Sequence, residues 1–166
     1  MKEIYRKKRN QERLKELYPA FSRQIAKVIT DLELVGLRPR IQDAWRSQQD
    51  QLRAFNEGHS KLKFGFHNIT GQNGEKQSLA VDLLDDDAPV NMGTAYILRV
   101  TATAEKYGLT TGVRWGLPSK LANAVDAAIS AATWNVPVKV GWDPVHIESA
   151  NFTVAQAKGD ERPKFP

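Results

Sequence analysis

The chain has 166 residues, of which 41% are hydrophobic and 26% are charged, a balance typical of one folded domain rather than of a disordered chain. It contains no cysteine, which excludes disulfide frameworks, thiol nucleophiles and cysteine-ligated metal sites. Its three histidines are compatible with histidine–carboxylate chemistry. Its formal net charge of +5 is compatible with a polyanionic partner.

The positive charge is concentrated at the N-terminus. Residues 1–28 hold nine basic and three acidic side chains, a net charge of +6, so the remainder is near −1. We expect a basic helical segment over residues 1–18, which is either a solvated helix face or a surface for anionic envelope polymers. No recognised nucleic-acid motif accompanies it, so we expect no nucleic-acid partner. No apolar run follows the basic start, so we predict neither a signal peptide nor a membrane span.

Apolar residues at helical spacing predict a helix from Pro19 to about Val35, with Gly36 as its stop. A short strand is expected over 39–45, followed by a helix over 48–57. The remaining predicted elements, in chain order, are a polar loop, a buried strand, two helices and two strands: 68–78, 79–84, 94–107, 118–133, 136–142 and 145–148. This alternation predicts one α+β domain over residues 1–166 with a small antiparallel sheet flanked by helices, and a polar, frayed tail over 155–166.

Two of the three histidines lie near carboxylates in the sequence. His67 precedes Asp82 across the polar loop, and His146 follows Asp143 by three positions. A catalytic zinc ion commonly takes three ligands from histidine, aspartate and glutamate and leaves one position for water. His67, Asp82 and His146 would supply that set, and Asp143 would supply a general base. The alternative is that these are ordinary core or surface residues, because Asp-x-x-His also occurs by chance.

Several segments, taken in order, resemble one family of zinc peptidases. Residues 66–68 (Phe-His-Asn) and 79–83 (Leu-Ala-Val-Asp-Leu) are similar to its Ser-x-His-x-x-Gly-x-Ala-x-Asp signature. Residues 143–146 (Asp-Pro-Val-His) are similar to its downstream Glu/Asp-x-x-His, and 43–47 (Asp-Ala-Trp-Arg-Ser) to its Arg-Ser stretch. The family contains D-alanyl-D-alanine carboxypeptidases, L-alanyl-D-glutamate endopeptidases and phage endolysins. The resemblance covers about residues 12–149.

The resemblance implies a hedgehog/D,D-peptidase-like fold and a zinc ion (Zn2+) held by His67, Asp82 and His146. Asp143 takes the position of the base, and Arg46 that of the arginine that stabilises the oxyanion. The implied substrate is the peptidoglycan stem peptide. The favoured bond is L-alanyl-D-glutamate, and the alternative activity is that of a D-alanyl-D-alanine carboxypeptidase.

An endolysin-like protein of this kind would act as a monomer on the cell wall, after release from the cytoplasm by a bacteriophage holin. The more remote alternative is a non-catalytic module that binds nucleic acid or cell wall through its basic N-terminus. Salt-dependent binding without metal would distinguish that module from the enzyme.

The sequence departs from the family pattern at three places. Asp82 follows His67 by fifteen positions instead of seven. The eight extra residues lie in the polar loop, where a longer connection costs little, and their effect on the substrate cleft is left open. Gly65 and Ser78 replace a serine and a glycine of the signature, and the base is aspartate rather than glutamate. Three further site candidates carry weaker signals: Glu148 and Ser78, which would orient an imidazole or meet substrate, and His59, the fallback ligand.

Overall fold

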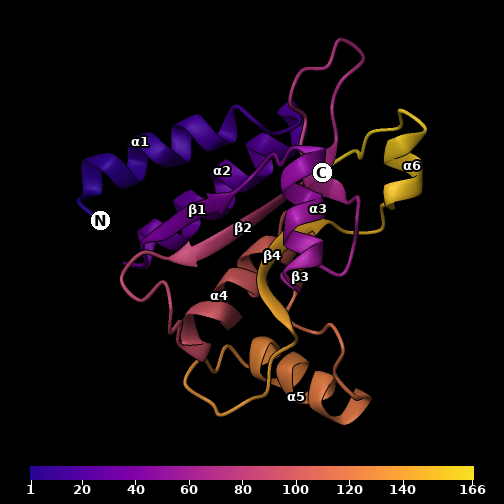
Figure 1. Cartoon of the computed structure of the whole chain (residues 1–166). Coiled ribbons are helices and arrows are strands. Elements are labelled where there is room, and N and C mark those ends of the chain that lie inside the picture. The colour runs from indigo at the N-terminus through magenta and orange to yellow at the C-terminus, as the bar shows by residue number, and fades with distance from the viewer.

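A four-stranded antiparallel sheet is the centre of the computed structural model, which describes residues 1–166 (Figure 1). The strands lie in the order β1-β2-β4-β3. Their bounds are Pro39–Asp43 for β1, Ala80–Asp85 for β2, Leu109–Gly112 for β3 and Asp143–Ser149 for β4. The predicted α+β class is therefore confirmed. The order makes β2 and β4 central neighbours, although they are far apart in the sequence.

Six helices and one 3₁₀ turn surround the sheet. They are α1 (Glu3–Leu14), α2 (Pro19–Leu34), α3 (Gln48–Asn56), η1 (Phe66–Asn68), α4 (Thr94–Glu105), α5 (Ser119–Ser130) and α6 (Val154–Lys158). Helix α2 contacts β1 and α4, and α4 contacts β3 and β4. Figure 1 shows α3 on the viewer's side of the strands and α5 at the lower end of the molecule. None of the helices is both long and apolar enough to cross a bilayer.

The core forms where the apolar stripe of α2 meets the sheet. Phe21, Ile25, Val28 and Leu32 recur every three or four residues, so they share one helix face, and all four are fully buried. Pro19 begins this helix, and Gly36 follows it with a positive φ of 81°, a conformation that glycine adopts without steric cost. The helix predicted from Pro19 to about Val35 therefore forms.

The strand predicted over 136–142 does not form. Alternating Val136, Val138 and Val140 suggested it, but these residues are half-buried and pack against the core without joining the sheet. The sheet position beside β4 is taken by β3, a four-residue strand in a segment for which no element was predicted. Because strand pairing is non-local, the alternating pattern alone could not show which segment pairs with β4.

The C-terminal residues, predicted to fray, are instead attached to the domain. They contain α6, whose Ala157 is buried, and the Phe165 ring lies 6.1 Å from the Phe21 ring. Arg162 donates hydrogen bonds to the Gln77 side chain and to the Thr70 carbonyl. The tail is therefore connected both to the core and to the loop that precedes β2.

The basic helix α1 covers the free edge of β1. Asn10 donates to the Pro39 carbonyl and accepts from the Ile41 amide, at 2.9 and 2.8 Å. Arg9 donates to the carbonyls of Ile41 and Gln42, both at 2.8 Å. An unpaired strand edge invites association with other chains, so side chains that satisfy this edge stabilise the fold and protect it.

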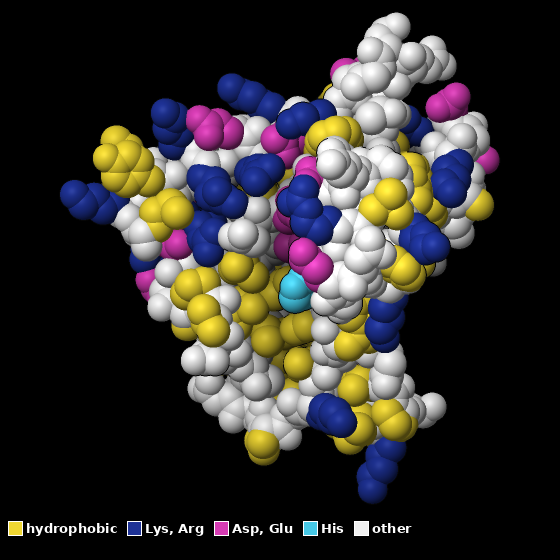
Figure 2. All heavy atoms as spheres, in the orientation of Figure 1, with side chains coloured by type: hydrophobic (Ala, Val, Ile, Leu, Met, Phe, Trp, Pro, Cys, Tyr) yellow, Lys and Arg dark blue, Asp and Glu magenta, His cyan; other side chains and the backbone are white.

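Much of the N-terminal charge is thus used within the molecule rather than presented at its surface. Among the exposed lysines of α1, Lys7 lies 3.6 Å from Glu3 and Lys8 lies 3.9 Å from Glu12. Figure 2 shows acidic side chains interspersed with the basic ones at the upper left, where α1 lies. The binding of anionic envelope polymers by this helix stays a prediction.

Replacing Arg6 by alanine is expected to lower the free energy of unfolding by about 2–4 kcal/mol, because a buried, multiply bonded cation is lost. The Arg6 side chain is 1% exposed and donates to the Pro39 carbonyl at 2.6 Å and to Glu33 at 2.6 Å. Urea denaturation measures the change. A Lys7→Ala control, which removes a nearby exposed cation, is expected to change stability by less than about 0.5 kcal/mol. Equal effects of the two variants would contradict the role of Arg6.

Candidate metal centre

Two strands and one turn bring the predicted metal ligands together. Asp82 of β2 and His146 of β4 are direct partners in the antiparallel ladder. His67 lies in η1, which is attached to β2 by the hydrogen bond from the Leu79 amide to the Phe66 carbonyl at 3.0 Å. Antiparallel pairing therefore places three residues from separate parts of the sequence at one point.

The three side chains offer their ligand atoms to a common centre. These atoms all lie within 4.8 Å of one another. Asp82 Oδ1 is 3.4 Å from His67 Nε2 and 3.3 Å from His146 Nδ1, and the imidazole rings lie edge to face with centroids 5.2 Å apart. Asp82 Oδ1 is buried and accepts no hydrogen bond. Since a buried carboxylate oxygen without a partner is costly, this donor set fits a metal ion.

The outward nitrogen of each imidazole is already bonded. His67 Nδ1 lies 2.5 Å from the Ala44 carbonyl oxygen, and His146 Nε2 lies 2.9 Å from Glu148 Oε2. Both oxygens can only accept, so each of these nitrogens carries the proton and donates it. In the neutral imidazole form, the inward nitrogen of each ring then has a free lone pair, as metal ligation requires.

The electrostatics of the group favour a bound cation. Burial alone would raise the pKa of Asp82, but the adjacent His67 and His146 outweigh it and hold this carboxyl well below its usual range. Burial alone would lower the pKa of His146, but Asp82 and Glu148 raise it to about 10. The negative charges of Asp82 and Glu148 therefore stabilise a positive charge at this buried position. Either a proton on His146 or a bound metal ion can provide that charge.

Asp143 begins β4 at an irregularity of the sheet. The register shifts between Thr111 and Gly112, where Gly112 faces Asp143. A Cβ atom on Gly112 would lie 2.0 Å from the Asp143 carbonyl oxygen, so only glycine permits this close approach. Burial raises the pKa of Asp143, and the neighbouring charge of Asp82 raises it further. A carboxylate with a raised pKa is suited to accept a proton.

Arg46 is held rigidly beside the ligand group. Its Nε and Nη2 donate to Asp43 Oδ2 at 2.9 and 2.5 Å, and its Nη1 donates to Gln51 Oε1 at 2.9 Å. Arg46 Nη2 is also 3.7 Å from Asp82 Oδ2. These bonds leave the guanidinium little freedom, so it is a fixed positive charge next to the candidate metal position.

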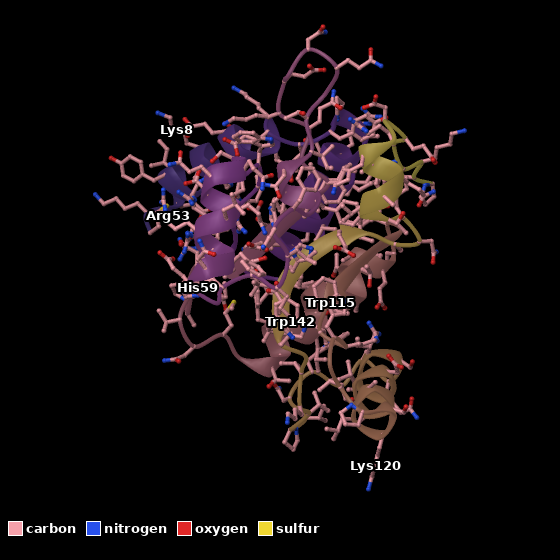
Figure 3. All side chains as sticks on the ribbon, turned by 45° about the vertical axis from the view of Figure 1, so that its right-hand side comes forward. Lys8, Arg53, His59, Trp115, Lys120 and Trp142 are labelled. Atoms are coloured by element: carbon pink, nitrogen blue, oxygen red, sulfur yellow. The ribbon has the colours of Figure 1, made fainter.

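A cavity of about 500 Å³ opens over the ligand group. Its polar lining contains Arg46, Asp143 and Glu148 together with the three ligand residues. Two tryptophans form part of its wall. Their ring centroids are 5.6 Å apart, and that of Trp115 is 5.1 Å from the His146 ring. Figure 3 shows Trp115 and Trp142 side by side, with His59 across from them near the end of α3.

The structure thus brings together six of the residues singled out from the sequence: Arg46, His67, Asp82, Asp143, His146 and Glu148. The other two candidates, Ser78 and His59, lie outside this group. Ser78 is fully buried outside the cavity and donates to the Ala80 and Ala44 carbonyls, so its expected contact with substrate is wrong. His59 lines the cavity, but its side chain is 76% exposed and outside the ligand group.

The eight-residue insertion does not reach the cavity. Thr70 and Lys76 pair as an isolated antiparallel bridge, and this hairpin projects from the upper end of the molecule in Figure 1. None of residues 70–77 lines the cavity, so the insertion forms no part of its wall. A hairpin closes on its own hydrogen bonds, as between the Gly71 amide and the Glu75 carbonyl, which lets the extra residues leave the sheet unchanged.

Comparison with known proteins gives a likeness in structure but none in sequence. No protein-family model matches the chain, and no curated protein matches it. Among solved structures, the crystal structure of the Serratia marcescens L-Ala D-Glu endopeptidase ChiX matches with a TM-score of 0.53 and 17% sequence identity, over 86% of each chain. The chain therefore shares its fold with this endopeptidase.

Proposed function

We propose that the protein is a zinc-dependent peptidoglycan peptidase that hydrolyses the L-alanyl-D-glutamate bond of the stem peptide. The observation that carries the proposal is the buried His67–Asp82–His146 group, which lies in a cavity whose wall also holds Asp143 and Arg46. Two nitrogens and one carboxylate oxygen, with no cysteine in the chain, are a ligand set typical of catalytic zinc. The fold shared with an L-Ala D-Glu endopeptidase supports the choice of bond.

A zinc ion bound there would act as a Lewis acid and would lower the pKa of a coordinated water. The chain's own residues carry the remaining tasks. Asp143 accepts a proton from the attacking water and returns it to the leaving amine. Arg46, fixed by Asp43 and Gln51, stabilises the negative charge that develops on the carbonyl oxygen. Glu148 and the Ala44 carbonyl hold the two imidazoles in orientation.

The test combines metal analysis with product analysis on purified peptidoglycan. We expect one zinc ion per chain and new N-terminal D-glutamate in the digest. A chelator is expected to abolish cleavage, and added zinc to restore it. Released D-alanine would show the carboxypeptidase activity instead. A protein that binds no zinc and cleaves neither bond would overturn the proposal.

A further inference from the structure

The geometry points to Lys61 as the specificity residue that pairs with a substrate carboxylate on the residue following the scissile bond. This inference rests on the proposed function and deepens it. Lys61 lies between α3 and η1 and lines the cavity that contains the candidate metal centre.

An aromatic wall links Lys61 to the candidate metal centre. Lys61 Nζ lies 4.3 Å from the centroid of the Trp142 ring, within the range of a cation–π contact. Trp142 lies against Trp115, and Trp115 lies against His146 (Figure 3). Lys61 is therefore part of the same cavity wall as His146.

Charge distribution within the cavity makes Lys61 the cation that is available to a ligand. The other permanently charged cation that lines the cavity is Arg46, and it already forms an ion pair with Asp43. Lys61 contacts an aromatic face and makes no ion pair with any carboxylate of the chain. The acidic residues of the cavity, Asp82, Asp143 and Glu148, are located around the histidines instead. An anionic group that enters the cavity would therefore find its unpaired positive charge at Lys61.

One buried amide links the segment that carries Lys61 to Arg46. Gln51 is 3% exposed, and its Nε2 donates to Ser60 Oγ at 2.9 Å and to the Leu62 carbonyl at 2.6 Å. Its Oε1 accepts from Arg46 Nη1. The residues on both sides of Lys61 are thus attached to the side chain that orients Arg46. This attachment keeps the segment that carries Lys61 at the cavity beside Arg46.

The chemistry of the proposed substrate matches this arrangement. A glutamyl residue has two carboxyl groups, and chain continuation uses only one of them. The other is a free carboxylate only a few bonds from the amide that joins the glutamyl residue to alanine. A lysine ammonium on the cavity wall would recognise it by a charge-assisted hydrogen bond, which an amidated glutamyl residue could not form equally well.

The experiment uses two synthetic stem peptides that are identical except that the free glutamyl carboxylate is replaced by an amide in one of them. We expect the wild-type protein to cleave the carboxylate peptide with a kcat/KM about tenfold higher, as one charge-assisted hydrogen bond supplies. In Lys61→Met this ratio is expected to fall to about one, mainly through KM, and Lys61→Arg is expected to restore it.

Lys63→Met is the matched control, because Lys63 lies two residues further on, stacks on Phe55 and does not line the cavity. It is expected to keep the wild-type ratio. A Lys61→Met variant that keeps the tenfold ratio, or that loses rate equally on both peptides, would overturn the role of Lys61 while leaving the proposed function intact. A wild-type protein that cleaves neither peptide at the alanyl–glutamyl bond would overturn both.

Discussion

Replacing His67 by alanine is expected to weaken zinc binding by more than about 100-fold and to abolish peptidase activity. Changes in the groups that merely orient a ligand already cost about 10–100-fold in metal affinity, so loss of a ligand costs more. His67 Nε2 faces Asp82 Oδ1 within a set of only three ligand residues. The substitution removes the hydrogen bond from His67 to the Ala44 carbonyl. The fold is expected to persist, because Ser78 Oγ also donates to this carbonyl and keeps it hydrogen-bonded. Competition with a chromophoric chelator measures the affinity, and thermal unfolding checks the fold.

His59→Ala is the matched control for this variant. His59 is the remaining histidine that lines the cavity, but its side chain is largely exposed and lies 4.0 Å from Glu57 rather than in the ligand group. We expect it to bind zinc as the wild type does. If His59→Ala lost zinc and His67→Ala kept it, the ligand set would be wrong, and His59 would have to replace His67 in it.

An Asp143→Asn variant is expected to bind zinc normally but to cleave the stem peptide about 10²–10⁴-fold more slowly. General acid–base catalysis contributes a factor of this size, and an amide of the same shape cannot accept the proton. Asp143 lines the cavity but lies outside the three-residue ligand group, so the metal is expected to stay bound. Single-turnover kinetics on a synthetic stem peptide, together with the zinc content, separates the two effects.

The control makes the same chemical change away from the cavity. Asp126 of α5 forms an ion pair with Arg114 at 2.6 Å, and Asp126→Asn is expected to leave the cleavage rate within about twofold of wild type. An Asp143→Asn variant that kept more than a tenth of the wild-type rate would argue against its role as the base. Loss of zinc in that variant would show instead that Asp143 belongs to the ligand set.

Local patterns in the sequence were sufficient for most of the helices and for part of the candidate site. The apolar spacing of α2, its initial Pro19 and its terminal Gly36 each act within one or two turns, so each could be read without the fold. The motif segments around His67, Asp82 and His146 likewise selected three candidate ligand residues, whose ligand atoms lie within 4.8 Å of one another in the structure. The absence of cysteine had already restricted the ligands to nitrogen and oxygen.

Only the tertiary structure decided which segments meet. It paired β3 rather than residues 136–142 with β4, and it placed the hairpin insertion away from the cavity. In the folded protein, Arg6 and Arg9 donate hydrogen bonds to backbone carbonyls of β1, although the charge count had suggested a free basic surface.

The cavity wall is the clearest example of the same limit. Nothing in the sequence relates Lys61 to Trp142 or to Gln51, yet the three side chains line one cavity with the candidate metal ligands. The sequence therefore determined the residue types available for the chemistry and most of the helices. The sheet order and the cleft were decided by long-range pairing, because strand partners and cavity walls are chosen by packing between segments and not by the properties of any one segment.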